Sequence, residues 1–249
     1  MSYLQSYLDR IRGKGNPALA DAIHKTVEDI VPQYISNFSF TDHVVSLLVG
    51  DVQSGKTSHM FGLMCAAADE SFMNFVLLTT DNILLQQQTY QRAQRDLCDF
   101  CVCDENDYLK FVQNNLHKPA VIVLKKNTSV LKQWKNNFSS TNFCAGNPLF
   151  IVDDEADAAS LNTQVNRNKQ STINKNLEAI KKTTSSSIYM QVTGTPQSIL
   201  LQTAKSGLET LFYSIILGRA RVIWEGISFF HRNHRNRLFL QTMMKPKNF

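Results

Sequence analysis

Val44-Val45-Ser46-Leu47-Leu48-Val49 runs directly into Gly50-Asp51-Val52-Gln53-Ser54-Gly55-Lys56-Thr57. The first six residues predict a buried strand, and the next eight fit the pattern G-x-x-x-x-G-K-[ST] of a phosphate-binding loop. Gly50 and Gly55 let the backbone turn tightly. Its N–H groups, with those of Gln53 and Ser54, can then face a polyphosphate at the N-terminus of the next helix. The stretch predicts an α/β nucleotide-binding domain.

Lys56 and Thr57 carry the chemistry of this loop. Lys56 is expected to reach the β- and γ-phosphates of ATP, and Thr57 to place its hydroxyl on Mg²⁺. The alternative is an ordinary glycine-containing turn between a strand and a helix. The flanking apolar strand favours the phosphate loop, so ATP and Mg²⁺ are the predicted ligands.

A second apolar stretch, residues 149–152, ends in the acidic run Asp153-Asp154-Glu155-Ala156-Asp157. Ligands of parallel α/β sheets bind outside the C-terminal ends of the strands, so these carboxylates should share an edge with the phosphate loop. We assign Asp154 to Mg²⁺ and Glu155 to the water that attacks the γ-phosphate. The alternative is an acidic first turn that stabilises a helix dipole.

The acidic run and the phosphate loop together carry a family resemblance. Residues 154–157 spell DEAD, and the chain resembles the first motor domain of superfamily-two helicases and translocases. More narrowly, it is similar to the Z-one-domain putative endonucleases of bacterial and phage restriction-like systems. In that family a Gln-Ser-Gly-Lys-Thr loop is paired with an Asp-Asp-Glu-Ala-Asp box and an Ala-Ser-Leu-Asn stretch, here residues 159–162. The resemblance covers about residues 43–205.

This resemblance implies a RecA-like P-loop NTPase fold, with a three-layer αβα parallel sheet. It also implies ATP hydrolysis coupled to action on DNA. Endonuclease activity would rest on family analogy alone, because the sequence contains no nuclease site that we can name.

Polar residues follow two further predicted strands. Thr79 follows the stretch 74–78, and Lys125 and Lys126 follow the stretch 120–124. The resemblance places nucleic-acid contacts here, and such groups can bind phosphates without reading bases. Ordinary surface lysines at the start of a helix are an equally good interpretation.

A coupling motif follows the last predicted strand, residues 187–192. Thr193-Gly194-Thr195-Pro196 resembles the Ser/Thr-Ala-Thr motif that links hydrolysis to strand movement, with Gly194 in place of alanine. The resemblance assigns Thr193, Thr195 and Asp157 to this coupling.

Apolar spacing divides the chain into three regions. Residues 1–42 are expected to form a helical segment with a break at Gly13–Pro17. Residues 43–205 alternate strands with amphipathic helices and predict a parallel sheet covered by helices. The strands are expected at 44–49, 74–78, 120–124, 149–152 and 187–192. Residues 206–249 form a basic tail.

The tail has two interpretations. Its charges favour nucleic-acid binding, since Glu225 is the one acid among many Arg and Lys residues after Gly218. A frameshifted, prematurely ended gene is the interpretation we favour, because shifting the codons of residues 218–226 by one base can restore the Glu-Pro-Gly-Leu-Tyr-Gly segment expected from the family. A second motor domain or a nuclease subunit would then be missing, and hydrolysis by this chain would be slow or absent.

Composition is that of an ordinary globular enzyme. The 249 residues carry a net charge of +5, which does not separate a nucleic-acid binder from a neutral enzyme. Apolar runs are too short for a membrane span and the N-terminus does not resemble a signal peptide, so we expect a cytoplasmic protein with no membrane partner. The runner-up function is a non-catalytic nucleic-acid-binding or interaction protein that keeps the P-loop fold.

The five cysteines fit a reducing compartment. Cys98, Cys101 and Cys103 are closely spaced, and in a zinc site Cys144 would supply the fourth thiolate. Ordinary thiols at the end of a helix are favoured, because no second Cys-x-x-Cys pair and no nearby histidine support a zinc site.

Overall fold

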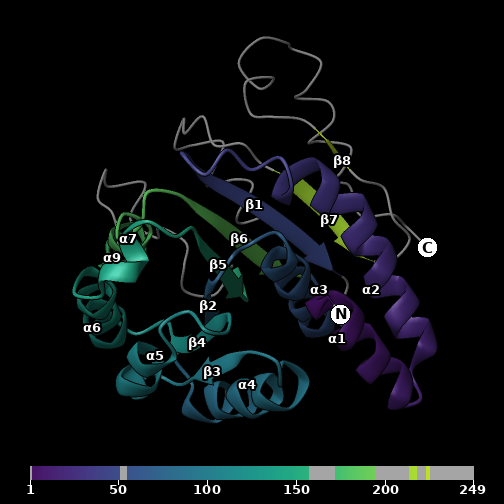
Figure 1. Ribbon diagram of the computed structural model, residues 1–249, viewed down its shortest axis with the longest axis horizontal. Coiled ribbons are helices and arrows are strands. Elements are labelled where there is room, and N and C mark those ends of the chain that lie inside the picture. The colour runs from purple at the N-terminus through teal and green to yellow at the C-terminus, as the bar shows by residue number, and fades with distance from the viewer. Residues whose placement is uncertain (1, 51–54, 157–171, 195–212, 218–222, 225–249) are drawn as a thin grey trace, which may run out of the picture.

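In the computed structural model, residues 2–50, 55–156, 172–194, 213–217 and 223–224 are described (Figure 1). Their strands form one sheet in the order β3-β4-β2-β5-β6-β1-β7-β8. Every neighbouring pair from β3 to β7 is parallel, and β8 runs antiparallel to β7. The predicted parallel α/β sheet of a RecA-like domain is confirmed.

The strands are β1 (His43–Gly50), β2 (Asn74–Thr79), β3 (Cys101–Cys103), β4 (Ala120–Lys125), β5 (Leu149–Asp154), β6 (Ser187–Thr193), β7 (Tyr213–Leu217) and β8 (Ile223–Trp224). The helices are α1 (Tyr3–Gly13), α2 (Pro17–Ile30), α3 (Lys56–Asp69), α4 (Ile83–Asp96), α5 (Tyr108–Asn114), α6 (Thr128–Ser139), α7 (Asn142–Ala145) and α9 (Thr172–Lys181), with a π-helical turn η1 (Val31–Ile35) after α2. The five expected strands correspond to β1, β2, β4, β5 and β6.

Three strands, β3, β7 and β8, were not expected. The three residues of β3 are too few to show a strand period, and they place Cys101 and Cys103 in the sheet rather than at a helix end. β7 lies in the region taken as a basic tail, and it pairs with β1 from Leu47↔Ser214 to Gly50↔Leu217. The sheet therefore continues beyond residue 205, while the proposed division into regions stays a prediction.

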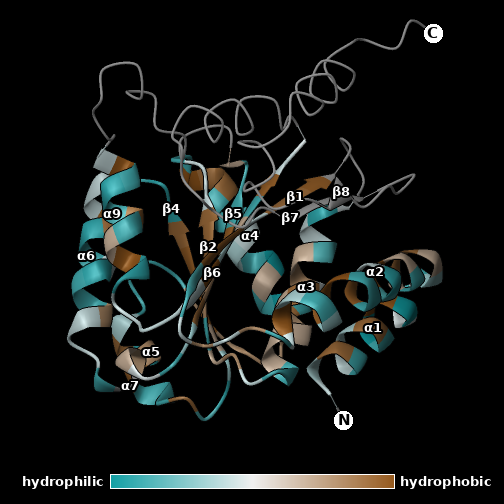
Figure 2. Ribbon diagram, turned by 90° about the horizontal axis from the view of Figure 1, so that it is seen from above, coloured by the Kyte–Doolittle hydropathy of each residue, from teal (hydrophilic) through white to brown (hydrophobic). Residues whose placement is uncertain are grey.

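Helices cover both faces of the sheet, which gives three layers (Figure 2). Alternate residues of one strand enter two different cores, as expected from the strand period of two. In β2, Phe75 and Leu77 join the core under α1, α2, α3 and α4, whereas Val76 and Leu78 join the core under α5, α6 and α9. All six residues of β2 are buried, so its continuous apolar run is that of a central parallel strand.

α3 is buried on all sides. Residues 58–68 are inaccessible to solvent because the sheet covers one side of the helix and α1 and α2 cover the other. The Asp69 carboxylate, at the end of α3, accepts backbone hydrogen bonds from Tyr3 and Leu4 at 2.8 and 3.1 Å. The predicted N-terminal helices and their break are confirmed, and these helices pack directly on the helix that follows the phosphate loop.

No helix in the described part of the chain has both the length and the apolar character to cross a membrane.

Candidate nucleotide site

The phosphate loop and the acidic run lie at one edge of the sheet. β6 separates β1 from β5, and the register aligns Val49 with Thr193 and Asp154 with Val192. Parallel strands are spaced about 4.8 Å apart, so the ends of β1 and β5 lie about 10 Å from each other. Lys56 follows one strand end and Glu155 follows the other. A gap of this size suits a polyphosphate and its bound cation.

Gly55 caps the helix that carries Lys56 and Thr57. Its φ of +76° lies in the left-handed region that favours glycine. A Cβ atom at Gly55 would also lie 3.3 Å from Leu19 Cδ1, so α2 closes the space beside the loop. Lys56 and Thr57, the first two residues of α3, are half-buried. The predicted ligands Gln53 and Ser54 lie outside the described residues, and Gly50 ends β1.

The carboxylates of the acidic run differ sharply in environment. Asp153 is fully buried and accepts hydrogen bonds from Lys126 Nζ at 2.9 Å and from Tyr189 Oη at 2.5 Å. Burial, together with the negative charges of Glu155 and Asp153, raises the pKa of Asp154 to about 6, although Lys126 opposes the rise. Glu155 is exposed and has a left-handed backbone, with φ +55°.

These environments fit the proposed Mg²⁺ site. The acidic run carries more negative charge than Lys126 balances, and burial together with this negative charge raises the pKa of Asp154. Within the described ranges, no three His, Cys, Asp or Glu side chains form a metal-binding group. A nucleotide-bound Mg²⁺ does not need one, because phosphate oxygens, water, one hydroxyl and one carboxylate suffice. The assignment of that hydroxyl to Thr57 and that carboxylate to Asp154 stays a prediction.

The expected nucleic-acid contacts are not available in this structure. Lys126 is fully buried beneath the acidic run, where it balances Asp153. Thr79 is also buried and donates to the carbonyl oxygens of Thr80 and Leu124 at 3.3 and 3.4 Å. Lys125 is largely buried and pairs with Glu105 at 3.1 Å. The strand ends turn these groups toward the protein, and their contact with nucleic acid stays a prediction.

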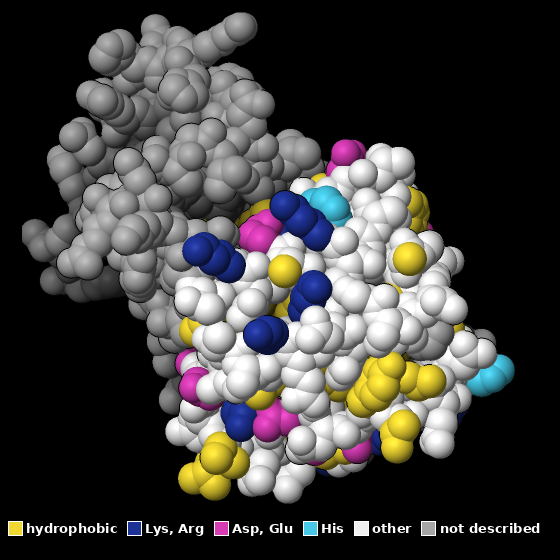
Figure 3. Space-filling view, turned by 90° about the vertical axis from the view of Figure 1, so that its left-hand side faces the viewer, with side chains coloured by type: hydrophobic (Ala, Val, Ile, Leu, Met, Phe, Trp, Pro, Cys, Tyr) yellow, Lys and Arg dark blue, Asp and Glu magenta, His cyan; other side chains and the backbone are white. Residues whose placement is uncertain are grey.

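The described surface of the α5, α6 and α9 side is mixed in charge. Figure 3 shows Lys and Arg side chains interspersed with acidic and hydrophobic ones on this face. Nucleic-acid binding usually requires clustered positive charge. The described part of this face therefore shows no cluster of positive charge that could contact a phosphate backbone in place of Thr79, Lys125 and Lys126.

Thr193 ends β6 between the two halves of the site and is buried. Gly194, next to it, is exposed. Asp157 and Thr195, which we assigned with Thr193 to coupling, lie outside the described residues, so that assignment stays a prediction.

Sequence reasoning missed the residues that hold α3 in place. Tyr7 Oη donates to the carbonyl oxygen of Ser58 at 3.0 Å, and Arg92 Nη2 donates to Ser58 Oγ at 2.8 Å. His59 is buried in the same turn, and this burial lowers its pKa to about 4. The signal was the unbroken apolar run 60–68, since a helix that is apolar on every side must be covered on every side.

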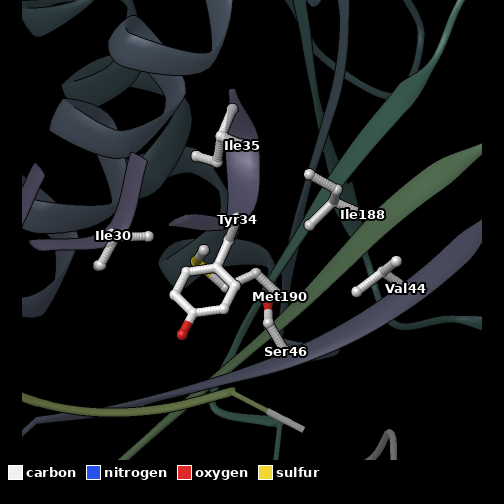
Figure 4. A pocket seen from close by; sticks show the side chains of 7 residues that line it. All are labelled: Ile30, Tyr34, Ile35, Val44, Ser46, Ile188 and Met190. Atoms are coloured by element: carbon white, nitrogen blue, oxygen red, sulfur yellow. The ribbon is translucent and has the colours of Figure 1, made fainter. Parts of the chain in front are cut away.

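A small apolar cavity lies elsewhere, between η1 and strands β1 and β6 (Figure 4). Its lining residues are Ile30, Tyr34, Ile35, Val44, Ser46, Ile188 and Met190. The strand residues among them come from the N-terminal halves of β1 and β6, away from the edge that carries the phosphate loop. The cavity is therefore separate from the candidate nucleotide site.

The cysteines are free thiols. Cys101 Sγ and Cys103 Sγ are 3.8 Å apart on β3, and Cys144 is buried in the core on the α6 side. The residues described here form no metal-binding group, so the zinc alternative gains no support from them.

No model of a known protein family matches the sequence, and no curated protein matches it. Among solved structures, the chain is similar to the crystal structure of the Pyrococcus furiosus Hef helicase domain. The TM-score is 0.43 at 15% sequence identity, and the match covers 74% of this chain and 37% of that chain. The chain thus spans well under half the length of that helicase domain.

Proposed function

We propose that this chain is the ATP-binding motor half of a DNA-acting, superfamily-two helicase-like ATPase from a restriction or phage-defence type system. The observation that carries the proposal is the shared sheet edge. There a glycine-capped helix that begins with Lys56 and Thr57 follows β1 in the chain. In the sheet, β6 alone separates β1 from β5, the strand that ends in Asp154. The Z-one-domain motifs supply the narrower family and the DNA substrate.

Each residue at this edge has a distinct role in the proposal. Lys56 binds the β- and γ-phosphates, and the first N–H groups of α3 add positive potential at the same place. Thr57 and Asp154 hold Mg²⁺, which neutralises charge on the phosphates when bound. Glu155, exposed beside them, orients the attacking water. Asp153 is excluded from this chemistry because Lys126 and Tyr189 already satisfy its carboxylate.

Hydrolysis by this chain is proposed to be slow. An arginine placed against the γ-phosphate can be worth about 10³ to 10⁵ in rate. The arginines among the described residues are Arg10, Arg12, Arg92 and Arg95, which lie in α1 and α4 and pair with acidic residues. We propose that a second motor domain or subunit supplies this group.

The test is calorimetric titration of the protein with ATP, in Mg²⁺ and in EDTA. We expect Mg²⁺-dependent binding that Lys56→Ala weakens at least about tenfold, because a charge-assisted contact to phosphate is lost. Lys25→Ala is the matched control, since Lys25 is exposed on α2. Equal affinity in the two variants would remove Lys56 from the site. A folded wild type that binds no ATP would favour the non-catalytic interaction protein instead.

A further inference from the structure

The Lys126 ammonium is bound entirely within the protein, beneath the acidic run. Its Nζ lies 2.9 Å from Asp153 Oδ1, 2.9 Å from the Asp154 carbonyl oxygen and 2.7 Å from the Glu155 carbonyl oxygen. An ammonium has three N–H donors, and these three acceptors use all of them. Lys126 thus connects the buried Asp153 to the backbone of Asp154 and Glu155, the two residues whose carboxylates are proposed to act on the nucleotide.

Reaching this position requires a long side chain. Lys126 directly follows β4, and β2 lies between β4 and β5 in the sheet. The Lys126 N–H donates to the carbonyl oxygen of Thr79 at 2.9 Å, so its backbone is fixed at the end of β2. From there the side chain extends past β2 to the end of β5. A short polar residue at this position could not make the same contacts.

The backbone that Lys126 binds is in an unfavourable conformation. Glu155 has φ +55°, a left-handed conformation that is unfavourable for a non-glycine residue and persists only where neighbours impose it. The carbonyl oxygens of Asp154 and Glu155 converge on one ammonium in this turn. Two charge-assisted hydrogen bonds offset the cost of the left-handed residue.

We propose that Lys126 is a positioning residue, which fixes the Asp154–Glu155 turn so that its carboxylates face the phosphate loop in one geometry. Asp153 serves as the counter-charge that keeps the Lys126 ammonium buried. The expected effect of Lys126 on Mg²⁺-dependent ATP binding rests on the function proposed above. Its expected effect on the geometry of the Asp154–Glu155 turn does not depend on that function.

The experiment compares Tyr189→Phe with the double variant Lys126→Met and Asp153→Asn. Replacing both charges avoids an unpaired buried ion, and removing a whole buried pair is often neutral for stability. Tyr189→Phe keeps the Lys126 contacts to Asp153 and to both carbonyl oxygens. Hydrogen exchange of the backbone around residues 154–156 is measured, with β2 as the internal reference.

We expect exchange in the turn to be at least about tenfold faster in the double variant than in Tyr189→Phe, with β2 unchanged. ATP affinity in EDTA should stay within about twofold of wild type, while the gain in affinity on adding Mg²⁺ should fall about tenfold or more. A purely structural role would lower both affinities together. Equal turn exchange in the two variants would overturn the proposal.

Tyr189→Phe covers the case in which the double variant does not fold. It removes the other partner of Asp153 and leaves every Lys126 contact in place. The proposal predicts wild-type exchange in the turn, and faster exchange there in Tyr189→Phe would refute it. A wild type that binds no ATP would end the proposed function, while the exchange comparison would still decide whether Lys126 holds the turn.

Discussion

Replacing Gly62 by alanine tests whether the N-terminal helices hold the phosphate-loop helix. Gly62 lies in the middle of α3, and a Cβ atom there would lie 2.4 Å from Ile23 Cγ2 on α2. Carbon atoms pack best at about 3.5–4.0 Å, and the branched Ile23 side chain cannot easily rotate away. The substitution must therefore separate α2 from α3.

Whether Gly62→Ala raises or lowers the free energy of unfolding distinguishes an open helix face from a closely packed one. In an open helix, Gly→Ala is worth about 1 kcal/mol of added stability. Overpacking costs about 1–3 kcal/mol, and an overlap of this size belongs near the upper end. We expect Gly62→Ala to lower the free energy of unfolding by about 2 kcal/mol, which corresponds to a melting temperature lower by about 4–8 °C for a chain of this length.

Thermal and urea unfolding measure the effect, and Gly13→Ala is the control. Gly13 is also helical, and a Cβ there would meet no atom within 4 Å, so this variant should be at least as stable as wild type. Adding Ile23→Ala to Gly62→Ala should remove the clash. The double variant should therefore lose less stability than the two single variants lose together, by about 1 kcal/mol or more. A Gly62→Ala protein more stable than wild type would refute the close packing of α2 on α3.

Three further outcomes are expected. Glu155→Gln should leave ATP affinity nearly unchanged and lower whatever hydrolysis a turnover assay detects, and equal turnover would remove Glu155 from the mechanism. Burial lowers the pKa of His59 to about 4, below the usual 6.5. Between these pH values, His59 therefore binds a proton in the unfolded chain but not in the folded one. Stability should be complete above pH 6.5 and fall by up to about 3 kcal/mol as the pH drops toward 4. Urea titrations at several pH values measure how the free energy of unfolding changes with pH. His59→Phe should make this change smaller, whereas His117→Gln, a control at an exposed position, should leave it as in wild type. Asp96 is buried, which raises its pKa, but hydrogen bonds from Arg95 and Lys14 outweigh this and leave the pKa below its usual value. The stability it contributes is therefore present above the usual carboxyl pKa and is lost as the pH falls through the lowered one, and Asp96→Asn should destabilise the protein at pH 7 more than at pH 3.

The sequence was sufficient for the features that depend on neighbouring residues. The runs 74–78 and 120–124 have the length and composition of central parallel strands, because a strand buried on both faces must be largely apolar. The phosphate loop was recognisable because its glycines, lysine and threonine act within eight consecutive residues. The N-terminal helices and their break followed from a period of 3.6 and from Gly13 and Pro17.

Only the tertiary structure decided which distant groups meet. Lys126 and Asp153 are 27 residues apart in the sequence and lie on strand ends separated by β2, so local spacing could not pair them. The same strand order turned Thr79 inward and left Glu155 exposed beside the phosphate-loop edge. β3 and β7 become strands because each gains backbone hydrogen bonds from a partner already in the sheet, β4 and β1. Motif residues could thus be chosen from local pattern, but whether a lysine binds a ligand or holds the turn beside it depends on the order in which the strands assemble.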